Sequence, residues 1–357
     1  MSFPLAGLAR PVLLLSISGL VACSTNPQGV APAAPSGVQT ALSASGVQTS
    51  ILPSGEHEVR IGARSIRFGG LRHHASGGRG WTTPAARTKG LLYGSSYDGG
   101  FINIYHERGT NQSPIGQLTT GLTSPQGIVV DQHHRLWVAN TNAFNVVAFK
   151  RGATAPFRTL NDPGYYPIGV AVDSNGTVYA ANAEGTSGPP GNVTVWAKGS
   201  SNPSATLTYS NFLIVLGIGV DASNNVYVSY VPTSGPPAVV VFPAGSQTGQ
   251  PLAIQDTTIS DITFDSSANL VMEDGSGGLG IWDPPYTSGP NRTLSVFGNE
   301  PTLSRRDRNV WIAYANPSFP MIEGYNYTTG AQIDTITSGF TTAAIPYGVA
   351  LDPANAP

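Results

Sequence analysis

Residues 169–182 read GVAVDSNGTVYAAN, in which a polar turn separates two short apolar runs. Residues 127–140 (GIVVDQHHRLWVAN) and 217–230 (GIGVDASNNVYVSY) repeat this pattern, so the three copies start 42 and 48 residues apart. Worn copies begin at residues 261 and 302, and a last start, GVALD, occupies residues 348–352. Self-similarity with a period of about 40–50 residues is typical of a propeller or another repeat array.

Each copy predicts a strand, a turn and a second strand, because β-branched and aromatic residues flank turn formers. The Asp between the two runs suits an Asx turn, and we interpret it as structural rather than catalytic; these residues are Asp131, Asp173, Asp221, Asp265 and Asp352. A third run ends on an aromatic residue that we expect to pack between neighbouring sheets, at Tyr105, Phe149, Trp196, Phe242, Trp282 and Tyr325. A fourth run follows, and four strands per repeat favour a propeller blade.

The two ends of the repeat region complement each other. The last start, at residues 348–352, has no second strand after it, whereas the first copy, at residues 91–105, lacks a start. We therefore predict that residues 347–352 supply the innermost strand of a blade whose other strands come from residues 91–118. The predicted fold is all-β, a six-bladed propeller of four-stranded antiparallel blades over residues 90–357. The C-terminal strand closes the ring by pairing with the N-terminal blade, which removes an open edge.

The repeat resembles those of the NHL-repeat propellers and their gluconolactonase (senescence-marker) and virginiamycin B lyase relatives. The matching stretches are residues 125–140, 167–182, 217–230 and 346–352. The resemblance implies the fold. It leaves function open, because such propellers include enzymes, scaffolds and binding modules.

The N-terminus resembles a bacterial lipoprotein signal. Residues 11–21 are an apolar run too short to span a bilayer as a stable helix, and LVAC at residues 20–23 resembles the lipobox. We predict that residues 1–22 are a signal peptide and that Cys23, the single cysteine, is lipidated. The alternative is a chance cysteine after an ordinary signal peptide. The prediction implies an extracytoplasmic protein, periplasmic or on the cell surface, that is lipid-anchored to a bacterial membrane.

Residues 23–89 are predicted to hold the anchor cysteine, a flexible tether and a basic lead-in to the propeller. Residues 24–55 are rich in Ser, Ala, Pro, Gly and Gln, a composition that favours disorder. Residues 59–89 carry seven Arg or Lys and no acidic residue. We interpret this stretch as a solvated or partly ordered lead-in that can drape over the propeller, and the alternative is contact with anionic lipid headgroups.

The amino-acid composition limits which kinds of partner the protein can bind. Residues 90–357 contain 10 Lys or Arg and 18 Asp or Glu, a net charge of −8, which disfavours nucleic acid because such ligands require a basic face. Only 11% of the chain is charged, well below the usual share. The remaining polar surface of Gly, Ser, Thr and Asn suits a β protein outside the cytoplasm.

The sequence offers few groups for catalysis at the channel mouth. The resemblance to gluconolactonases implies metal ligands just before each innermost strand, but the matching positions hold no Asn, Asp, Glu or His: Gln126, Ile168, Leu216, Ser260, Thr302 and Tyr347. At the ends of the second strands, Asn140, Asn182 and Asp274 could form a ring for a metal or a polar ligand; the alternative is that they cap turns. We predict no catalytic residue, no resident metal and no cofactor.

Aromatic residues offer a second candidate surface at the mouth. They are Tyr165, Tyr166, Phe212, Tyr230, Tyr314 and Tyr347. Exposed tyrosines suit contact with a glycan, peptide or protein. The alternative is that these residues pack the loops and fill the channel.

These observations favour a non-catalytic, lipid-anchored binding or scaffold module whose partner is an envelope protein or a glycan. The alternative is a metal-dependent hydrolase or lyase of the gluconolactonase group, with Asn140, Asn182 and Asp274 holding the cation. We expect a monomer.

Overall fold

The computed structural model describes residues 41–42, 47–61, 64–75, 78–254, 260–274, 278–296, 298–316 and 318–353. These residues belong to one compact unit, Val38–Pro357. Cys23 and the predicted signal peptide lie outside the described residues. Within them the chain forms seven antiparallel sheets and two 3₁₀ helices, η1 (Pro84–Arg87) and η2 (Thr141–Ala143). Neither helix has the length or apolarity of a membrane span.

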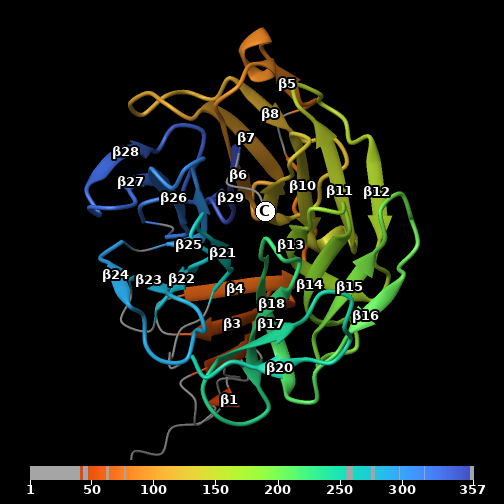
Figure 1. Ribbon diagram of the computed structural model, residues 1–357. Coiled ribbons are helices and arrows are strands. Elements are labelled where there is room, and N and C mark those ends of the chain that lie inside the picture. The colour runs from red at the N-terminus through yellow and green to blue at the C-terminus, as the bar shows by residue number, and fades with distance from the viewer. Residues whose placement is uncertain are drawn as a thin grey trace, which may run out of the picture. The chain divides into compact units, whose positions relative to one another are not determined.

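Six of the described sheets are propeller blades (Figure 1). From the channel outward, the first blade comprises β29 (Val349–Asp352), β6 (Leu91–Ser96), β7 (Phe101–His106), β8 (Gly116–Leu118) and β5 (Trp81–Thr82). The second comprises β9 (Pro125–Val130), β10 (Arg135–Asn140), β11 (Asn145–Lys150) and β12 (Arg158–Asn161). The third comprises β13 (Tyr165–Val172), β14 (Val178–Gly185), β15 (Asn192–Trp196) and β16 (Ala205–Leu207).

The remaining blades repeat the arrangement. The fourth comprises β17 (Phe212–Val220), β18 (Val226–Pro232), β19 (Ala238–Phe242) and β20 (Gln250–Pro251). The fifth comprises β21 (Thr263–Phe264), β22 (Leu270–Glu273), β23 (Leu279–Trp282) and β24 (Arg292–Leu294). The sixth comprises β25 (Asn299–Leu303), β26 (Asn309–Tyr314), β27 (Met321–Asn326) and β28 (Gln332–Ile336).

The innermost strands close a ring, as the sequence predicts. The strands β9, β13, β17, β21, β25 and β29 each contact the next, and β29 contacts β9. In the first blade, the C-terminal strand β29 pairs with β6, with Val349 opposite Gly94 and Leu351 opposite Leu92. Asp352 on β29 then binds the second blade, through Arg151 at 2.5 Å and His134 at 2.6 Å. Both ends of the repeat region are therefore held in one blade.

The core lies between the blades. Among the described residues, six apolar clusters each join two successive blades around the ring. Five of the six predicted interblade aromatics are almost fully buried, namely Tyr105, Phe149, Trp196, Phe242 and Trp282, whereas Tyr325 is partly exposed. Burying a large apolar side chain contributes about 1.5–3 kcal/mol, so this packing holds the ring together.

Turn capping was predicted for all five repeated Asp residues, and four of them cap turns in the structure. Asp131 Oδ1 accepts hydrogen bonds from the backbone N–H groups of His133 and Arg135, at 2.9 and 3.0 Å. Asp221 and Asp265 make the same pair of bonds in the fourth and fifth blades, and Asp173 accepts one from Thr177. Asp352 differs because it ends β29, the last strand, and joins two blades instead.

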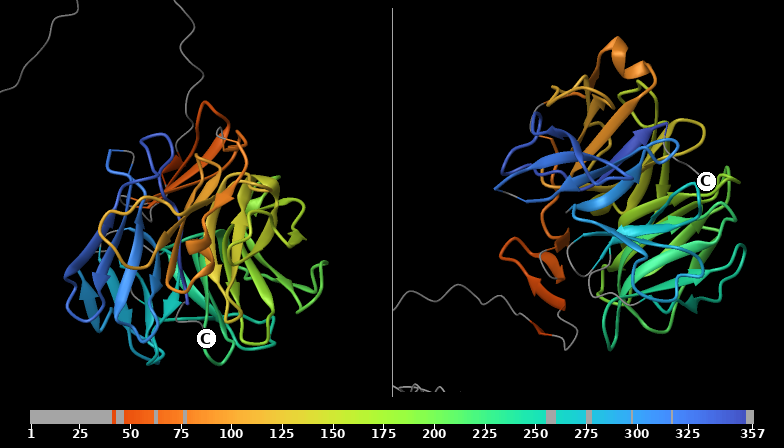
Figure 2. Two further views of the ribbon diagram at one scale, coloured as in Figure 1. Left: turned by 90° about the horizontal axis from the view of Figure 1, so that it is seen from above. Right: turned by 60° about the vertical axis from the view of Figure 1, so that its left-hand side comes forward.

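Residues 47–55, predicted as flexible tether, are instead folded together with residues 56–61 and 64–69. They supply most of a seventh sheet, the N-terminal sheet, comprising β1 (Ala41–Leu42), β2 (Val47–Ile51), β3 (Glu56–Ile61) and β4 (Arg64–Gly69). The sequence did not predict this sheet, because the apolar residues of the segment are few and are scattered among polar ones. Pairing places Val47, Val59, Ile61, Ile66 and Phe68 on one face. Figure 2 shows the sheet at one end of the propeller.

Candidate functional site

The N-terminal sheet closes one end of the propeller channel. We call this end the mouth; it is surrounded by Gln126, Ile168, Leu216, Asn299, Glu300 and Tyr347. Ile66 on β4 completes the lining, and the space left between these residues measures only about 10 Å³. A space of this size holds about one water molecule. The mouth is thus filled by the chain's own strand.

One predicted mouth position differs in the structure. The pairing of β25 with β26 shifts register between Asn299 and Thr302. Glu300 therefore lines the mouth, while Thr302 lines the channel further along. The predicted ring without carboxylates was wrong at this blade, because a bulge in a worn repeat cannot be located by counting residues.

The two faces of the N-terminal sheet make different contacts with the propeller. Its apolar face packs on Ile168, Ala183, Ile214, Leu216 and Val231 from the third and fourth blades. Its other face carries Arg67, whose guanidinium donates to the Tyr347 hydroxyl at 3.0 and 3.1 Å and pairs with Asp98 at 2.8 Å.

The polar backbone of β4 is also bound. The Gln126 side chain donates to the Arg67 carbonyl at 2.7 Å, and the Gly69 N–H donates to Asn142 Oδ1 at 3.0 Å. These bonds satisfy backbone groups on the β4 edge, which would otherwise be costly to bury. Gln126, one of the uncharged residues that interrupt the expected metal ring, thus holds the N-terminal sheet.

The predicted aromatic surface is largely packed. Phe212 and Tyr230 are each 2% exposed and Tyr347 is 4% exposed, so these three cannot serve as an open binding face. Tyr166 lies between Phe68 and Phe144, with ring centroids 5.6 and 5.3 Å away. The remaining two, Tyr165 and Tyr314, are partly exposed. The N-terminal sheet accounts for part of this burial, since Phe68 and Arg67 come from β4.

The predicted polar ring is engaged within separate blades. Asn140 accepts from the Thr123 N–H at 2.6 Å and donates to the Gly121 carbonyl at 2.9 Å. Asn182 donates to Asn192 and Thr194, at 2.7 and 3.0 Å. Asp274 accepts from the Gly278 N–H at 2.9 Å and from the Thr293 hydroxyl at 3.1 Å. Only Asp274 caps the turn that follows it; Asn140 makes no side-chain cap for η2 and bonds to Thr123 and Gly121, which precede it, and Asn182 bonds to side chains of β15.

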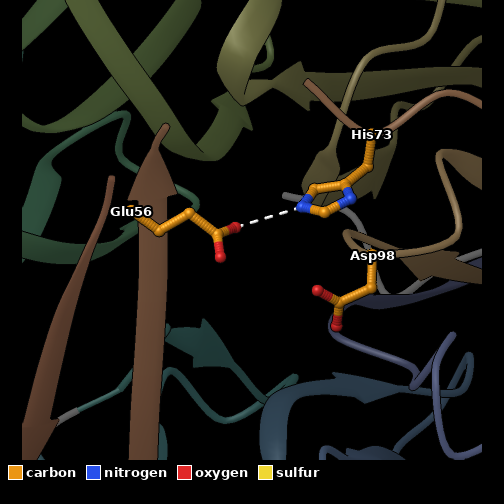
Figure 3. A group of neighbouring side chains, drawn as sticks. All are labelled: Glu56, His73 and Asp98. Atoms are coloured by element: carbon orange, nitrogen blue, oxygen red, sulfur yellow. Dashed lines mark hydrogen bonds and ion pairs between the residues drawn. The ribbon is translucent and has the colours of Figure 1, made fainter. Parts of the chain in front are cut away.

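A different group of chemistry-bearing side chains meets beside the mouth (Figure 3). Glu56 lies on β3, His73 follows the N-terminal sheet, and Asp98 lies in the loop between β6 and β7. One ligand atom from each lies within 4.8 Å of the others. The distance from His73 Nε2 to Glu56 Oε1 is 3.1 Å. The side chains are mostly buried, at 5% exposed for Glu56, 22% for His73 and 14% for Asp98.

The two carboxylates of this group have opposite pKa shifts. Burial raises the pKa of Glu56, but hydrogen bonds from His73 and Ser54 and the charge of Arg67 outweigh it, so the net shift is downward. Burial raises the pKa of Asp98, and Arg67 and His73 offset only part of that rise. The Asp98 carboxylate is therefore the less stabilised of the two when ionised.

A groove opens between the apolar face of the N-terminal sheet and the third and fourth blades. Its volume is about 580 Å³, and its lining includes Ile51, Val59, Phe68, Pro189, Leu213 and Ile214. His57 on β3 and Glu184 on β14 lie within it and pair at 2.7 Å. Burial raises the pKa of Glu184, and His57 lowers it in part. The groove is thus mainly apolar, and its His57–Glu184 pair joins a partly exposed histidine to a buried carboxylate.

The channel itself is a second cavity, of about 320 Å³. Aliphatic residues of the innermost strands line it, among them Val130, Val172, Val220 and Leu303. Asp131, Asp221 and Asp265 also line it, but their carboxylates already cap turns. The channel therefore brings together few polar groups that are free for chemistry.

Sequence reasoning missed Glu56, His73 and Asp98 as a group. The three residues lie in three segments that no repeat relates, so no motif spacing connects them. The available signal was weak: Glu56 and Glu58 are the only acidic residues before the propeller.

Comparisons with known proteins identify the fold of this chain but do not assign it to a family. No family model matches the sequence, and the search of curated proteins found no match. A chain in the crystal structure of a nidogen/laminin complex is similar, with a TM-score of 0.57 and 15% identity over 73% of this chain and 97% of that chain. A chain in the mitotic checkpoint complex gives a TM-score of 0.44 at 13% identity, over 60% and 67%. At such identities the likeness to the first structure shows a β-propeller fold alone.

Proposed function

We propose that this protein is a non-catalytic binding module that holds an envelope protein at a membrane through acylated Cys23. One observation carries the proposal: the chain's own N-terminal sheet occupies the propeller mouth. Enzymes on this fold need reactive groups and an open path at the mouth, whereas here Ile66 and Arg67 take that space. A binding module can still bind a partner through its other surfaces when its mouth is occupied.

The groove beside the N-terminal sheet is the surface we assign to the partner. Its apolar lining and the 52% exposure of Ile51 suit the side chains of an extended protein segment. A glycan would need a more polar wall, because most of the exposed lining is apolar even though Thr49, Ser50, His57, Glu58 and Glu184 contribute to it. The similar propeller in the nidogen/laminin structure also comes from a protein complex.

A photo-crosslinking amino acid at position 51 tests this assignment in the native envelope. Ile333 on β28 is the matched control, because it is 45% exposed and lies away from the groove. We expect one protein adduct from position 51, identified by mass spectrometry, that is absent from position 333 and lost in Leu213→Glu. Identical adducts from both positions, or a glycan adduct alone, would reject the protein-binding assignment.

Fractionation tests the proposed anchor separately. Acylated Cys23 should partition with membranes and into the detergent phase, because several acyl chains bind a bilayer firmly. Cys23→Ser should move to the aqueous phase, while Ser36→Ala in the adjacent stretch should behave as the unchanged protein. Membrane retention of the Cys23→Ser protein would show that acylation is not the anchor.

The alternative of a metal-dependent hydrolase receives less support from these contacts. Asn140, Asn182 and Asp274 would have to give up bonds within three separate blades to share one cation. Asp274→Ala distinguishes the two functions: a calcium-linked or zinc-linked rise in Tm that disappears in this variant would favour the hydrolase.

A further inference from the structure

Three separate segments converge where the N-terminal sheet meets the first blade. Glu56 belongs to the sheet, Asp98 belongs to the propeller, and His73 lies in the connection between them. Figure 3 shows the three side chains directed toward a common point. The connection is itself fixed, because the His73 N–H donates to Ser124 Oγ at 3.1 Å. Any ligand bound by all three would fasten the sheet to the propeller.

We infer that Glu56, His73 and Asp98 form a binding site for a divalent transition-metal ion, Zn²⁺ foremost, which clamps the N-terminal sheet to the first blade. The inference goes beyond the proposed function, since it assigns a stabilising ion rather than a partner.

The groups around the site hold the carboxylates in place. Ser54 Oγ donates to Glu56 Oε2 at 2.9 Å, and Arg67 donates to Asp98 Oδ2 at 2.8 Å. The second oxygen of each carboxylate can then act as a ligand. Such outer hydrogen bonds orient metal ligands in proteins. The His73 ring packs on Tyr97, with centroids 5.3 Å apart, which limits its rotation.

The spacing is wider than a bound ion requires. Tetrahedral Zn²⁺ with bonds of about 2.0–2.1 Å places its ligand atoms roughly 3.4 Å apart. His73 Nε2 and Glu56 Oε1, which are 3.1 Å apart, are already close enough to share an ion. The ligand atoms of the whole group lie within 4.8 Å of one another, so the longer distances must shorten when an ion binds. A side-chain movement of about 1–1.5 Å toward the ion would complete the geometry.

The ligand types select the ion. One imidazole and two carboxylates suit Zn²⁺ and its neighbours in the first transition row, whereas Ca²⁺ and Mg²⁺ prefer oxygen ligands throughout. Charge also fits. Arg67 balances one of the two carboxylates, and a cation would balance the charge of the other within this mostly buried group. Arg67 remains in place because Tyr347 also accepts its hydrogen bonds.

Calorimetry and thermal unfolding test the site with Zn²⁺ and Ca²⁺ as probes. The full chain carries Cys23→Ser and no histidine tag, so that neither a thiol nor a tag competes for metal. We expect one Zn²⁺ per chain, a rise in Tm with Zn²⁺ and none with Ca²⁺. Asp98→Asn and Glu56→Gln should each weaken Zn²⁺ affinity at least about tenfold, the range seen when a ligand set is damaged.

His57→Ala is the matched control, because it removes a His–Glu pair that joins the same sheet to β14 of the third blade. It should leave Zn²⁺ affinity unchanged. The inference is overturned if about 100 μM Zn²⁺ does not bind, if Ca²⁺ binds equally well, or if His57→Ala weakens binding as much as His73→Ala does. Circular dichroism of each variant separates loss of the site from loss of the fold.

Discussion

The guanidinium of Arg67 donates two hydrogen bonds to the hydroxyl of Tyr347, at 3.1 Å from Nε and 3.0 Å from Nη2. Arg67 lies on β4 of the N-terminal sheet, and Tyr347 lies just before β29, the strand that closes the ring. The contact therefore joins segments 280 residues apart. The positive charge of Arg67 is mostly buried at this contact, and the Asp98 carboxylate forms an ion pair with it at 2.8 Å.

Replacement of Arg67 tests this contact. Arg67→Ala leaves Asp98 without its cation and Tyr347 without its donor, and the breaking of a buried pair costs about 3 kcal/mol. The urea midpoint of the full chain measures the loss. Arg60→Ala is the control, because Arg60 pairs with Glu58 while 57% exposed, and exposed pairs contribute less than about 1 kcal/mol. Equal losses in both variants would contradict the assigned role.

The apolar face of the N-terminal sheet should depend on Phe68, which is fully buried. Phe68→Ala leaves a cavity that costs about 3–5 kcal/mol. Since the sheet lies outside the ring, the expected result is faster hydrogen exchange in residues 47–69 and at the mouth, with little change in the outer strands. Ile51→Ala, at a position 52% exposed, should have no such effect. Uniform loss of protection across all blades would show that sheet and ring unfold together.

The link between the closing strand and the second blade should depend on Asp352, whose side chain is fully buried. Asp352→Asn removes the charge that pairs with Arg151 and His134, at an expected cost of about 3 kcal/mol in free energy of unfolding. Asp283→Asn, at an exposed position, should be neutral. Thermal unfolding of the two variants at equal ionic strength measures the difference. If Asp352→Asn does not lower the stability, Asp352 does not help to hold the ring closed.

Asp162 should make stability fall as pH rises. Burial raises its pKa from 3.8 to about 6, although hydrogen bonds from Thr194 and Asn182 oppose the shift. The folded state therefore binds the proton more tightly than the unfolded state between these two values, so the free energy of unfolding declines as pH increases through that window. A shift of this size corresponds to at most about 3 kcal/mol at pH 7.

Asp162→Asn isolates this effect, because the amide stays neutral and its oxygen can still accept from Thr194. We expect the variant to be more stable than the unchanged protein at pH 8, and the difference to disappear near pH 4. Urea midpoints at both pH values provide the measurement, with Asp283→Asn as control. A difference that does not vary with pH would exclude ionisation of Asp162 as its cause.

Repeat regularity accounts for what was predictable about the ring. The stretch at 169–182 and its copies impose the same strand pattern on each blade, and Val349 falls opposite Gly94 as the split repeat requires. In the worn copy that forms the sixth blade, the residue predicted to lie at the mouth was wrong by two positions. A bulge before Thr302 brings Glu300 to the mouth in its place. Asn140 could be located at a strand end from sequence, whereas β14 continues past Asn182 to Gly185. The hydrogen-bond partners of these two residues could not be predicted.

The sequence by itself determined the blades and the closure of the ring, because strand periodicity is local and the same solution recurs at each copy. Only the tertiary structure decided what lies over the mouth. Residues 47–69 are too polar to predict a sheet, and their scattered apolar side chains gain a shared face only when β2, β3 and β4 pair and meet Ile168 and Leu216. Burial against a distant surface supplies the free energy that the segment's own composition lacks.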